Sequence, residues 1–493
     1  MNHPGPSSPG SSRVVAPSRD DLVVASVSEV VGGPLGDHAG RHPWWTPLRV
    51  VLLLAALAMS LGIVAKAPCL DTAGDTTATS RYTDLCWSDT STAYVANGFA
   101  EGYWPFSDDG QLRARYAPAW VTPLPAYVGF AAQRITGLLT DTPDLDARAL
   151  VPVNEVIQQP GVRHETRVFT LVNAVLLAGV GLLAAGLLTG VRRTRPWDAA
   201  AFALAPVLVL FFPIAWELLA GAAVAGALWA FARRRSAVAG VAIGVGAATS
   251  PYAALLVVPA VAVLLRERRT REAGVLAASA VGAWAVLMQP ALLSSRDAWL
   301  ASWKGYTHGA DIGSLWLLMS QAGGLDPSNR TRLTITVVLV LAACAVVVWL
   351  SGRERWGFAS LSTVLVALTL VVSPASAPSY ALVLLPLAVV AVRQWSHLLV
   401  WQACEIGHWV LLGFYLGGLL APSGGGDARA YWLAVVLRIA GLVWLVAATV
   451  GAARDPLVAD IGEDLGDVDP VEAGRGEPDA DVDGLPDVGH ARA

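Results

Sequence analysis

The sequence has few charged residues and almost no lysine. Of its 493 residues, 15% are charged and 55% are hydrophobic, whereas about 25% of the residues in soluble domains are charged. Lysine occurs only at Lys66 and Lys304. These values exclude an ordinary water-soluble globular protein. Because the chain also lacks a basic run of the kind that phosphate backbones attract, we expect no nucleic-acid partner.

Cysteine is scarce as well, and its spacing excludes the common metal sites. The four cysteines form no Cys-x-x-Cys pair and no cluster with histidine, so we expect no bound metal and no cofactor. Cys344 and Cys404 fall in apolar runs, whereas Cys69 and Cys86 share a polar stretch. A disulfide there would contribute about 3 kcal/mol by closing a short loop. We favour this disulfide over the alternative of two unrelated small residues.

Long apolar runs are abundant. Runs such as 167–191, 332–350 and 431–450 are long enough to cross a bilayer as helices. The sequence therefore predicts an all-α polytopic membrane protein with one membrane domain over 45–453. The twelve predicted spans lie near 48–65, 167–191, 199–215, 217–232, 236–250, 251–265, 272–292, 332–350, 357–373, 380–393, 395–419 and 431–450.

Arginine clusters predict the orientation, because positively charged loops stay in the cytoplasm. The clusters lie at 192–195, 233–235, 266–271, 353–355, 393 and 454. Placing all of them inside predicts a multi-pass plasma-membrane protein with both termini cytoplasmic and with 66–166 as the first outer loop. Counting the apolar segment 119–139 as a span would move 192–195 outside, so we expect it to be a juxtamembrane or re-entrant helix.

The two ends of the chain differ from the part between them. Residues 454–493 hold twelve Asp and Glu against three Arg, and 1–44 are rich in Ser, Pro and Gly. Such segments cannot bury enough apolar surface to offset their chain entropy, so both are predicted to be disordered. The first apolar segment could also be a signal peptide cleaved near Ala67, but its long charged region and Pro68 favour an uncleaved anchor.

The predicted first outer loop carries the most informative polar residues. Residues 81–106 mix acidic and aromatic side chains, which is typical of a folded loop rather than a linker. Asp89 stands near the start of a short amphipathic helix. Either Asp89 or Ser88 merely caps this helix, or Asp89 has a catalytic role. The spacing alone leaves both interpretations open.

A second polar pair lies inside a predicted span. Glu405 and His408 are one helical turn apart, and such a pair either satisfies itself by hydrogen bonding or relays protons. We favour the structural interpretation, because we expect no partner carboxylate or arginine at a similar depth in other spans.

Five segments carry a resemblance to a known family through their order along the chain. They are 66–105 with Cys69, Cys86, Asp89 and Tyr94, then 215–220 (AWELLA), 308–316 (HGADIGSLW), 378–386 and 401–405 (WQACE). Over about 45–453 this order resembles the GT-C superfamily of polyprenol-phosphate-sugar-dependent glycosyltransferases. It is most similar to glycosyltransferase family 87, whose studied members are mannosyltransferases.

The resemblance implies a GT-C-like fold and an inverting sugar transfer, with mannose as the expected sugar. The implied partners are a polyprenyl-phosphate sugar donor, an envelope glycolipid or glycan acceptor, and membrane lipids. The resemblance implies that Asp89, at the matching place in the first outer loop, is the general base. A carboxylate among apolar and aromatic neighbours has a raised pKa, which suits this role. The substrate-binding candidates, which include cations for the lipid phosphate, are Lys66, Arg81, Tyr94, Glu101, Arg113, Arg115, Glu217, Lys304, His308 and Tyr380.

Two positions depart from the family pattern. Trp216-Glu217 stands where members commonly have Trp-Asp, although the longer carboxylate can still orient a sugar hydroxyl. Residues 248–252 (ATSPY) lack the lysine that often precedes a Tyr-Pro pair. Another cation must then hold the donor phosphate, or the donor differs.

Two other functions are compatible with the sequence. One is a transporter or flippase of lipid-linked sugars, and the other is a noncatalytic envelope-assembly protein. We expect a transferase to depend on Asp89 and to tolerate changes at Glu405, whereas a transporter would show the reverse.

Overall fold

The computed structural model describes Val23 and residues 44–70, 79–116, 121–141, 145–192, 195–421 and 426–454. Within these ranges all regular structure is helical, as the all-α prediction requires. The terminal segments 1–44 and 454–493, predicted to be disordered, lie outside the described residues except at Val23, Trp44 and Arg454.

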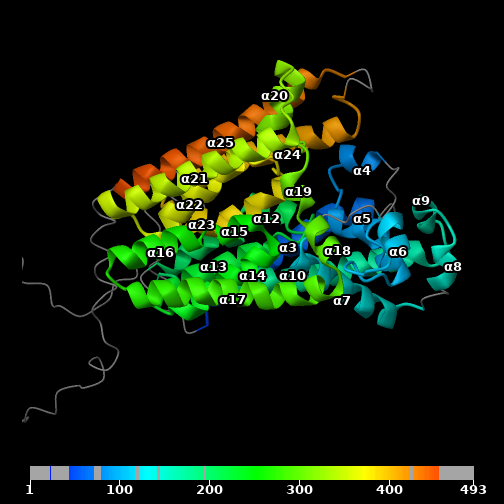
Figure 1. The fold of residues 1–493 in the computed structure, drawn as a ribbon, viewed down its shortest axis with the longest axis horizontal. Helices are drawn as coiled ribbons and strands as arrows, with labels where there is room; N and C mark the ends of the chain where they lie inside the picture. Colours follow the sequence, from blue (N-terminus) through cyan, green and yellow to red (C-terminus); the bar gives the residue numbers. More distant parts are fainter. Residues whose placement is uncertain are drawn as a thin grey trace, which may run out of the picture. The chain divides into compact units, whose positions relative to one another are not determined.

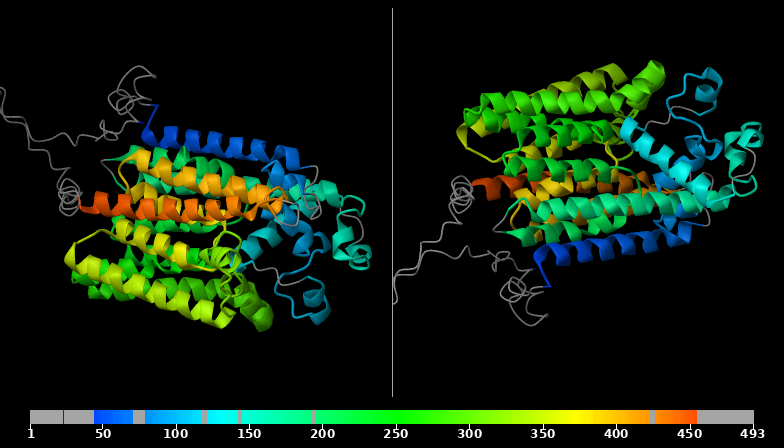
Figure 2. Two further views of the ribbon diagram at one scale, coloured as in Figure 1. Left: turned by 90° about the horizontal axis from the view of Figure 1, so that it is seen from above. Right: turned by 90° about the horizontal axis from the view of Figure 1, so that it is seen from below.

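The first outer loop is folded into short helices between α3 (Pro47–Lys66) and α10 (Val162–Thr189). In Figures 1 and 2 these short helices gather at one end of the bundle formed by the long helices. They are η1 (Ala67–Cys69), α4 (Ser80–Thr83), α5 (Asp89–Ala96), η2 (Phe99–Glu101), α6 (Gly110–Arg115), α7 (Pro123–Leu139), α8 (Leu145–Ala149) and α9 (Val153–Val156).

The chain after α10 alternates long helices with short connecting ones. They are η3 (Pro196–Ala199), α11 (Ala200–Ala203), α12 (Pro206–Phe211), α13 (Leu218–Ala232), α14 (Ser236–Thr249), α15 (Pro251–Ala254), α16 (Val257–Arg266), α17 (Thr270–Ser294), α18 (Arg296–Ser302), α19 (Lys304–Thr307), α20 (Leu315–Gly323), α21 (Asn329–Arg353), α22 (Phe358–Val372), η4 (Pro378–Tyr380), α23 (Ala381–Ala391), α24 (Trp395–Leu416) and α25 (Ala428–Arg454).

Five of the described helices are long and apolar enough to cross a membrane: α3, α10, α17, α21 and α25. Most of the other predicted spans are made of shorter or interrupted helices, whereas α24 is one continuous helix of 22 residues that is not among these five. The span predicted over 199–215 is not one continuous helix but is divided into η3, α11 and α12, because Pro206 has no amide hydrogen and begins a new helix. The total of twelve spans stays a prediction.

The helix ends that carry Arg266 and Arg353 lie at the end of the bundle that faces away from the outer-loop helices. α16 ends at Arg266 and α21 ends at Arg353, and both ends lie on the left in Figure 1, whereas α5, α6 and α8 lie on the right. This separation is what the predicted orientation requires.

The helix expected over 119–139 forms as α7, and it stays at the outer-loop end (Figure 2). At its start Thr122 Oγ1 donates to the carbonyl of Thr249 (2.5 Å), and Tyr127 donates to the carbonyl of Leu287 (2.9 Å). α7 is thus held beside α14 and α17 near the ends of these helices, as a juxtamembrane helix would be.

Small residues let α14 and α17 approach closely. A Cβ atom on Gly240 would lie 2.2 Å from the carbonyl oxygen of Leu276, and one on Gly244 would lie 2.3 Å from that of Ala280. Glycines four residues apart on one helix face are a common solution for helix packing in membranes, where backbone approach replaces hydrophobic driving force.

Candidate functional site

Backbone hydrogen bonds fix Asp89, the first residue of α5, against the turn between α12 and α13. The amides of Asp89 and Thr90 both donate to the carbonyl of Ile214, at 2.8 and 3.1 Å. Ser88 is the N-cap residue but makes no side-chain capping bond. Its hydroxyl donates instead to the carbonyl of Pro213 (2.6 Å), so the interpretation that Ser88 caps α5 through its side chain is wrong.

The Asp89 side chain combines exposure with close protein surroundings. The residue is exposed to solvent, yet protein surrounds it closely enough that desolvation raises its pKa to about 6. The negative charge of Asp311 raises the pKa further, while Arg81 and Lys66 act in the opposite direction. A carboxylate that substrate can reach and that titrates near neutral pH is suited to accept a proton.

Lys66 ends α3 and is only 5% exposed. Its Nζ donates to the carbonyl of Leu85 (3.3 Å) and lies 5.6 and 5.1 Å from the ring centroids of Trp87 and Trp409. Desolvated cation–π contacts of this kind hold an ammonium group in place. Lys66 and Asp89 interact electrostatically, and their roles as donor-binding cation and base stay predictions.

A disulfide joins the end of α3 to the segment that precedes α5. Cys69 and Cys86 are bonded, with their Cα atoms 5.6 Å apart. Cys86 is buried and stands three residues before Asp89, so the bond restrains the chain on which Asp89 is carried.

Glu217 and a group of three tyrosines form another wall of the site. Glu217 lies in the turn that precedes α13; burial raises its pKa to about 7, and the charge of Asp89 raises it further. Its Oε2 atom is buried and has no hydrogen-bond partner within the described structure. The rings of Tyr252 and Tyr380 are 4.9 Å apart, and each is 6.0 Å from Tyr306.

The sequence analysis did not select Tyr252 or Tyr306, although Tyr380 was a candidate. Burial raises the pKa of the Tyr306 hydroxyl, and the charges of Glu217 and Asp311 act in the same direction. Tyr252 donates to the carbonyl of Ala375 (2.5 Å) and lies 2.8 Å from the Ser373 hydroxyl. Three tyrosines from three separate segments can be recognised as one group only after the chain has folded.

Asp311 is a further carboxylate that acts on Asp89. The sequence analysis did not select it. Its Oδ1 accepts from the amide of Ile312 (2.7 Å) and its Oδ2 from the amide of Ser376 (3.1 Å). Asp311 lies in the segment 308–316 that carried part of the family resemblance, and this was the only signal that could have identified it.

Several predicted binding residues form hydrogen bonds or ion pairs with other side chains of the protein. The Tyr94 hydroxyl donates to Glu165 Oε2 (2.7 Å), and Arg115 pairs with Glu101 (2.7 Å). Arg113 lies 3.8 Å from Asp297, and Arg81 donates to the Tyr82 hydroxyl (3.0 Å). Lys304 and His308 are exposed. Their roles in binding stay predictions.

The expectation that no arginine lies at the depth of Glu405 is wrong. Arg438 on α25 donates from Nε to Glu405 Oε2 at 2.9 Å, and both side chains are 1% exposed. Trp401 also donates to Glu405 (3.3 Å), whereas neither ring nitrogen of His408 has a partner within the described structure. Arg438 is the only charged residue in the run 431–450, a signal that the sequence analysis overlooked.

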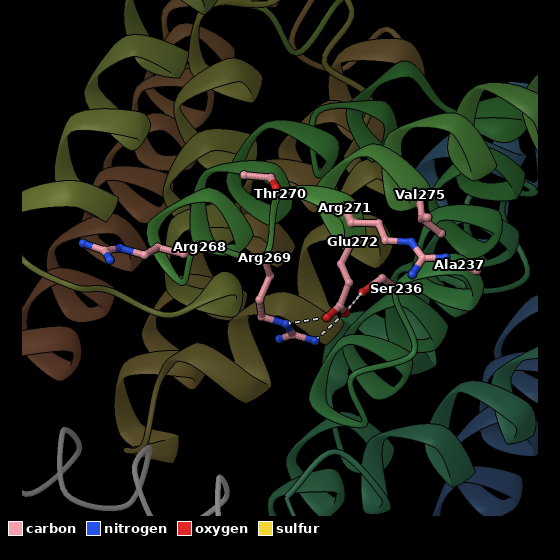
Figure 3. Close-up of a pocket in the computed structure, with 8 residues that line it drawn as sticks. All are labelled: Ser236, Ala237, Arg268, Arg269, Thr270, Arg271, Glu272 and Val275. Carbon is pink, nitrogen blue, oxygen red and sulfur yellow. Dashed lines mark hydrogen bonds and ion pairs between the residues drawn. The ribbon is translucent and has the colours of Figure 1, made fainter.

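A hollow at the other end of the bundle has different chemistry. Figure 3 shows Arg269 bridged to Glu272, which also accepts from Ser236 (2.7 Å). This hollow is lined by Ser236, Ala237, 268–272 and Val275 at the starts of α14 and α17, far along both helices from the outer loop. It lies at the arginine-rich end and contains none of the predicted site residues. Among the described residues, no group of three or more His, Cys, Asp or Glu side chains is placed to hold a metal ion.

Residues 161–374 match the family model described as Glycosyltransferase family 87. The match covers less than half of the chain, so it shows a likeness to this family over that segment. The resemblance expected from the sequence is confirmed over these residues. The matched segment includes Glu217, Tyr252, Tyr306 and Asp311, whereas Asp89 lies before it.

The other comparisons add little to this assignment. One solved structure that is similar to the chain is the crystal structure of ArnT from Cupriavidus metallidurans bound to undecaprenyl phosphate, at 16% identity and a TM-score of 0.35. The alignment covers 84% of this chain and 79% of that one, but a TM-score this low carries no argument. A search of the curated proteins gives no match.

Proposed function

We propose that this protein transfers a hexose, with mannose as the first sugar to test, from a polyprenyl-phosphate donor to an envelope glycolipid or glycan. The observation that carries the proposal is the Asp89 carboxylate, which is exposed and whose surroundings raise its pKa to about 6.

In the proposed reaction, Asp89 accepts the proton of an acceptor hydroxyl. The hydroxyl oxygen attacks the anomeric carbon of the sugar, a new glycosidic bond forms, and the bond from that carbon to the phosphate oxygen breaks. The configuration inverts, and the lipid phosphate leaves with the electron pair. General-base catalysis of this kind contributes about 10²–10⁴-fold to the rate.

Cations near Asp89 would stabilise the phosphate as negative charge develops on it. Lys66 and Arg81 are the cations whose charges act on Asp89, so they are the first candidates. The unpartnered Oε2 of Glu217 would accept a hydrogen bond from a sugar hydroxyl. The faces of Tyr252, Tyr306 and Tyr380 would pack against the sugar ring.

A transporter of lipid-linked sugars is the second hypothesis. Its main support was a proton relay through Glu405 and His408. The ion pair with Arg438 removes that support, because Glu405 is already balanced by a fixed charge. Replacing Glu405 would leave the Arg438 charge buried and without its carboxylate, so it is expected to harm the protein in either function and no longer separates the two hypotheses.

The experiment is incubation of the purified protein with radiolabelled polyprenyl-phosphate mannose and an envelope lipid extract. A labelled product that forms with the wild type and not with Asp89→Asn supports the transferase. Movement of labelled donor across a vesicle membrane without product formation supports the transporter. If neither sugar transfer nor transport is found with several sugars, the envelope-assembly role is the remaining hypothesis.

A further inference from the structure

Two outer segments that meet at the site are fastened to each other by Asp311. The first segment is 308–314 and the second is 373–377, which connects α22 to η4. The amide of Asp311 donates to the carbonyl of Pro374 (2.8 Å), and Asp311 Oδ2 accepts from the amide of Ser376 (3.1 Å). The position of the Asp311 carboxylate therefore depends on the position of 373–377.

The segment 373–377 lies between the two ends of the helix bundle and not at its outer end. α22 has 15 residues and α23 has 11, so α23 is about 16 Å long, whereas the 27 residues of α25 extend about 40 Å. The connection between the two short helices is thus recessed beside α25, where Arg438 can reach it.

Arg438 holds this recessed connection through its whole guanidinium group. Nη1 donates to both the carbonyl and the hydroxyl of Ser376, and Nη2 donates to the carbonyl of Ala377 (2.9 Å). Nε is occupied by Glu405, which fixes the plane of the group. A buried guanidinium that binds several acceptors in one plane is geometrically demanding, and lysine cannot replace it.

Gly313 shows how closely the three segments meet. A Cβ atom at this position would lie 2.4 Å from the carbonyl oxygen of Ser376, 2.8 Å from Arg438 Nη1 and 3.1 Å from His408 Cε1. Only glycine allows 308–314 to pass at this distance. Tyr431 on α25 donates to the carbonyl of Ile312, so α25 holds both segments.

We propose that Arg438, oriented by Glu405, is a positioning residue that holds 373–377 and thereby places the Asp311 carboxylate beside Asp89. This inference rests on the proposed function, in which Asp89 is the base. Arg438 touches no reacting atom. Its role is to keep a second negative charge near the base, so that Asp89 is a stronger proton acceptor than it would be alone.

The charges around Asp89 determine the sign of the expected effect. The negative charge of Asp311 raises the pKa of Asp89, and Arg81 from α4 and Lys66 from α3 lower it. Glu217 from the turn before α13 is coupled to Asp89, while Glu165 of α10, which packs on α5, is paired with Arg148. If 373–377 no longer holds Asp311 near Asp89, the pKa of Asp89 falls. The acid limb of the pH profile of kcat/KM then moves to lower pH.

The test compares Arg438→Lys, Asp311→Asn and the double variant by the pH dependence of kcat/KM. Each single variant is expected to shift the acid limb to lower pH and to reduce kcat by about tenfold or more, because small displacements at a reacting centre are costly, with little change in donor KM. The double variant is expected to show no further shift. A shift with Asp311→Asn but none with Arg438→Lys would overturn the proposal.

The matched control is Arg266→Lys. Arg266 likewise donates to two carbonyls, that of Ser351 in the last turn of α21 (3.1 Å) and that of Trp356 in the connection to α22 (3.0 Å), but at the arginine-rich end. Its pH profile should equal that of the wild type. Should Arg438→Lys fail to fold, Gly313→Ala inserts a methyl group between the same segments, and an unshifted limb in that variant would contradict the proposal.

Hydrogen exchange separates this proposal from the proposed function. In Arg438→Lys or Gly313→Ala the amides of Ser376 and Asp311 should exchange faster than in the wild type, whether or not the protein transfers sugar. Unchanged protection of both amides overturns the positioning role. If the wild type transfers no sugar, but hydrogen exchange in the variants is faster as expected, the proposed function fails. The positioning of 373–377 and Asp311 by Arg438 is then still supported.

Discussion

At the residue scale, Asp89 combines two properties that seldom occur together. The side chain is open to solvent, but its pKa is raised to about 6. The surrounding protein and the charge of Asp311 raise this pKa more than the two nearby cations lower it. An exposed carboxylate on an ordinary surface keeps a pKa near 4. Groups with a perturbed pKa are candidates for catalysis, which makes Asp89 the first residue to test.

Asp89→Asn should abolish sugar transfer, with a loss of about 10²–10⁴-fold, because asparagine keeps the size but cannot accept a proton at neutral pH. The backbone bonds from Asp89 and Thr90 to Ile214 remain, so the melting temperature should not fall at pH 7. The control is Asp84→Asn, an exposed carboxylate of the same loop. An Asp89→Asn protein that kept more than about a tenth of the wild-type rate would show that another group is the base.

Transfer should also depend on pH in a defined direction. Because Asp89 must be ionised to act and its pKa is about 6, kcat/KM should fall as pH is lowered through about 6. Between about pH 4 and 6 the folded protein binds more protons at Asp89 than the unfolded chain, so the contribution of Asp89 to stability decreases as pH rises through that window. An acid limb near pH 4 in the kcat/KM profile would contradict the raised pKa.

At the element scale, a buried ion pair fastens the outer loop to α10. Arg148 and Glu165 are 2.6 Å apart with side chains 2% and 1% exposed. Arg148 also donates to the carbonyl of Ala100 (2.7 Å), and Tyr94 donates to Glu165 (2.7 Å). α5, η2 and α8 are thus joined at one point on the start of α10, and α5 carries Asp89.

Glu165→Gln should destabilise the protein by about 3–5 kcal/mol, because it leaves the Arg148 charge buried without its counterion. Thermal unfolding in detergent measures the effect. The control is Asp297→Asn, which breaks the exposed pair with Arg113 (34% and 81% exposed) and should cost less than about 1 kcal/mol. Equal effects of the two substitutions would show that the buried pair does not hold the loop.

At the scale of the whole molecule, the outer-loop helices and the helix ends that carry Arg266 and Arg353 lie at opposite ends of the bundle (Figure 1). The positive-inside rule places the arginine end in the cytoplasm. The site at Asp89 then faces outward, where an envelope acceptor would be found. This orientation stays a prediction.

Cysteine labelling with a membrane-impermeant reagent tests it, in a protein whose Cys344 and Cys404 are replaced by alanine. Leu150→Cys, at a position 87% exposed in the outer loop, should be labelled in intact cells. Ala237→Cys, exposed at the other end, should be labelled only after lysis. The reverse pattern would mean that the site faces the cytoplasm.

The sequence by itself determined the all-helical class, the family resemblance and the positions of the long helices, and it selected Asp89 as the candidate base. These follow from local properties: apolar runs of bilayer length, arginines at helix ends, and a carboxylate in an aromatic loop. The parity of the arginine clusters also predicted that 119–139 does not cross the membrane, and α7 lies at the same end of the bundle as the other outer-loop helices (Figure 2).

Only the tertiary structure decided which polar groups meet. Arg438 and Glu405 are paired although 33 residues separate them in the chain, and Asp311 contacts the backbone of Ser376 from a loop 65 residues earlier. Helix length and position follow from the hydropathy of each run, but the rotation of one helix against another is set by the packing of all of them together. That packing decided that Tyr94 and Glu101 form internal contacts while Asp311 and Tyr306 lie at the site.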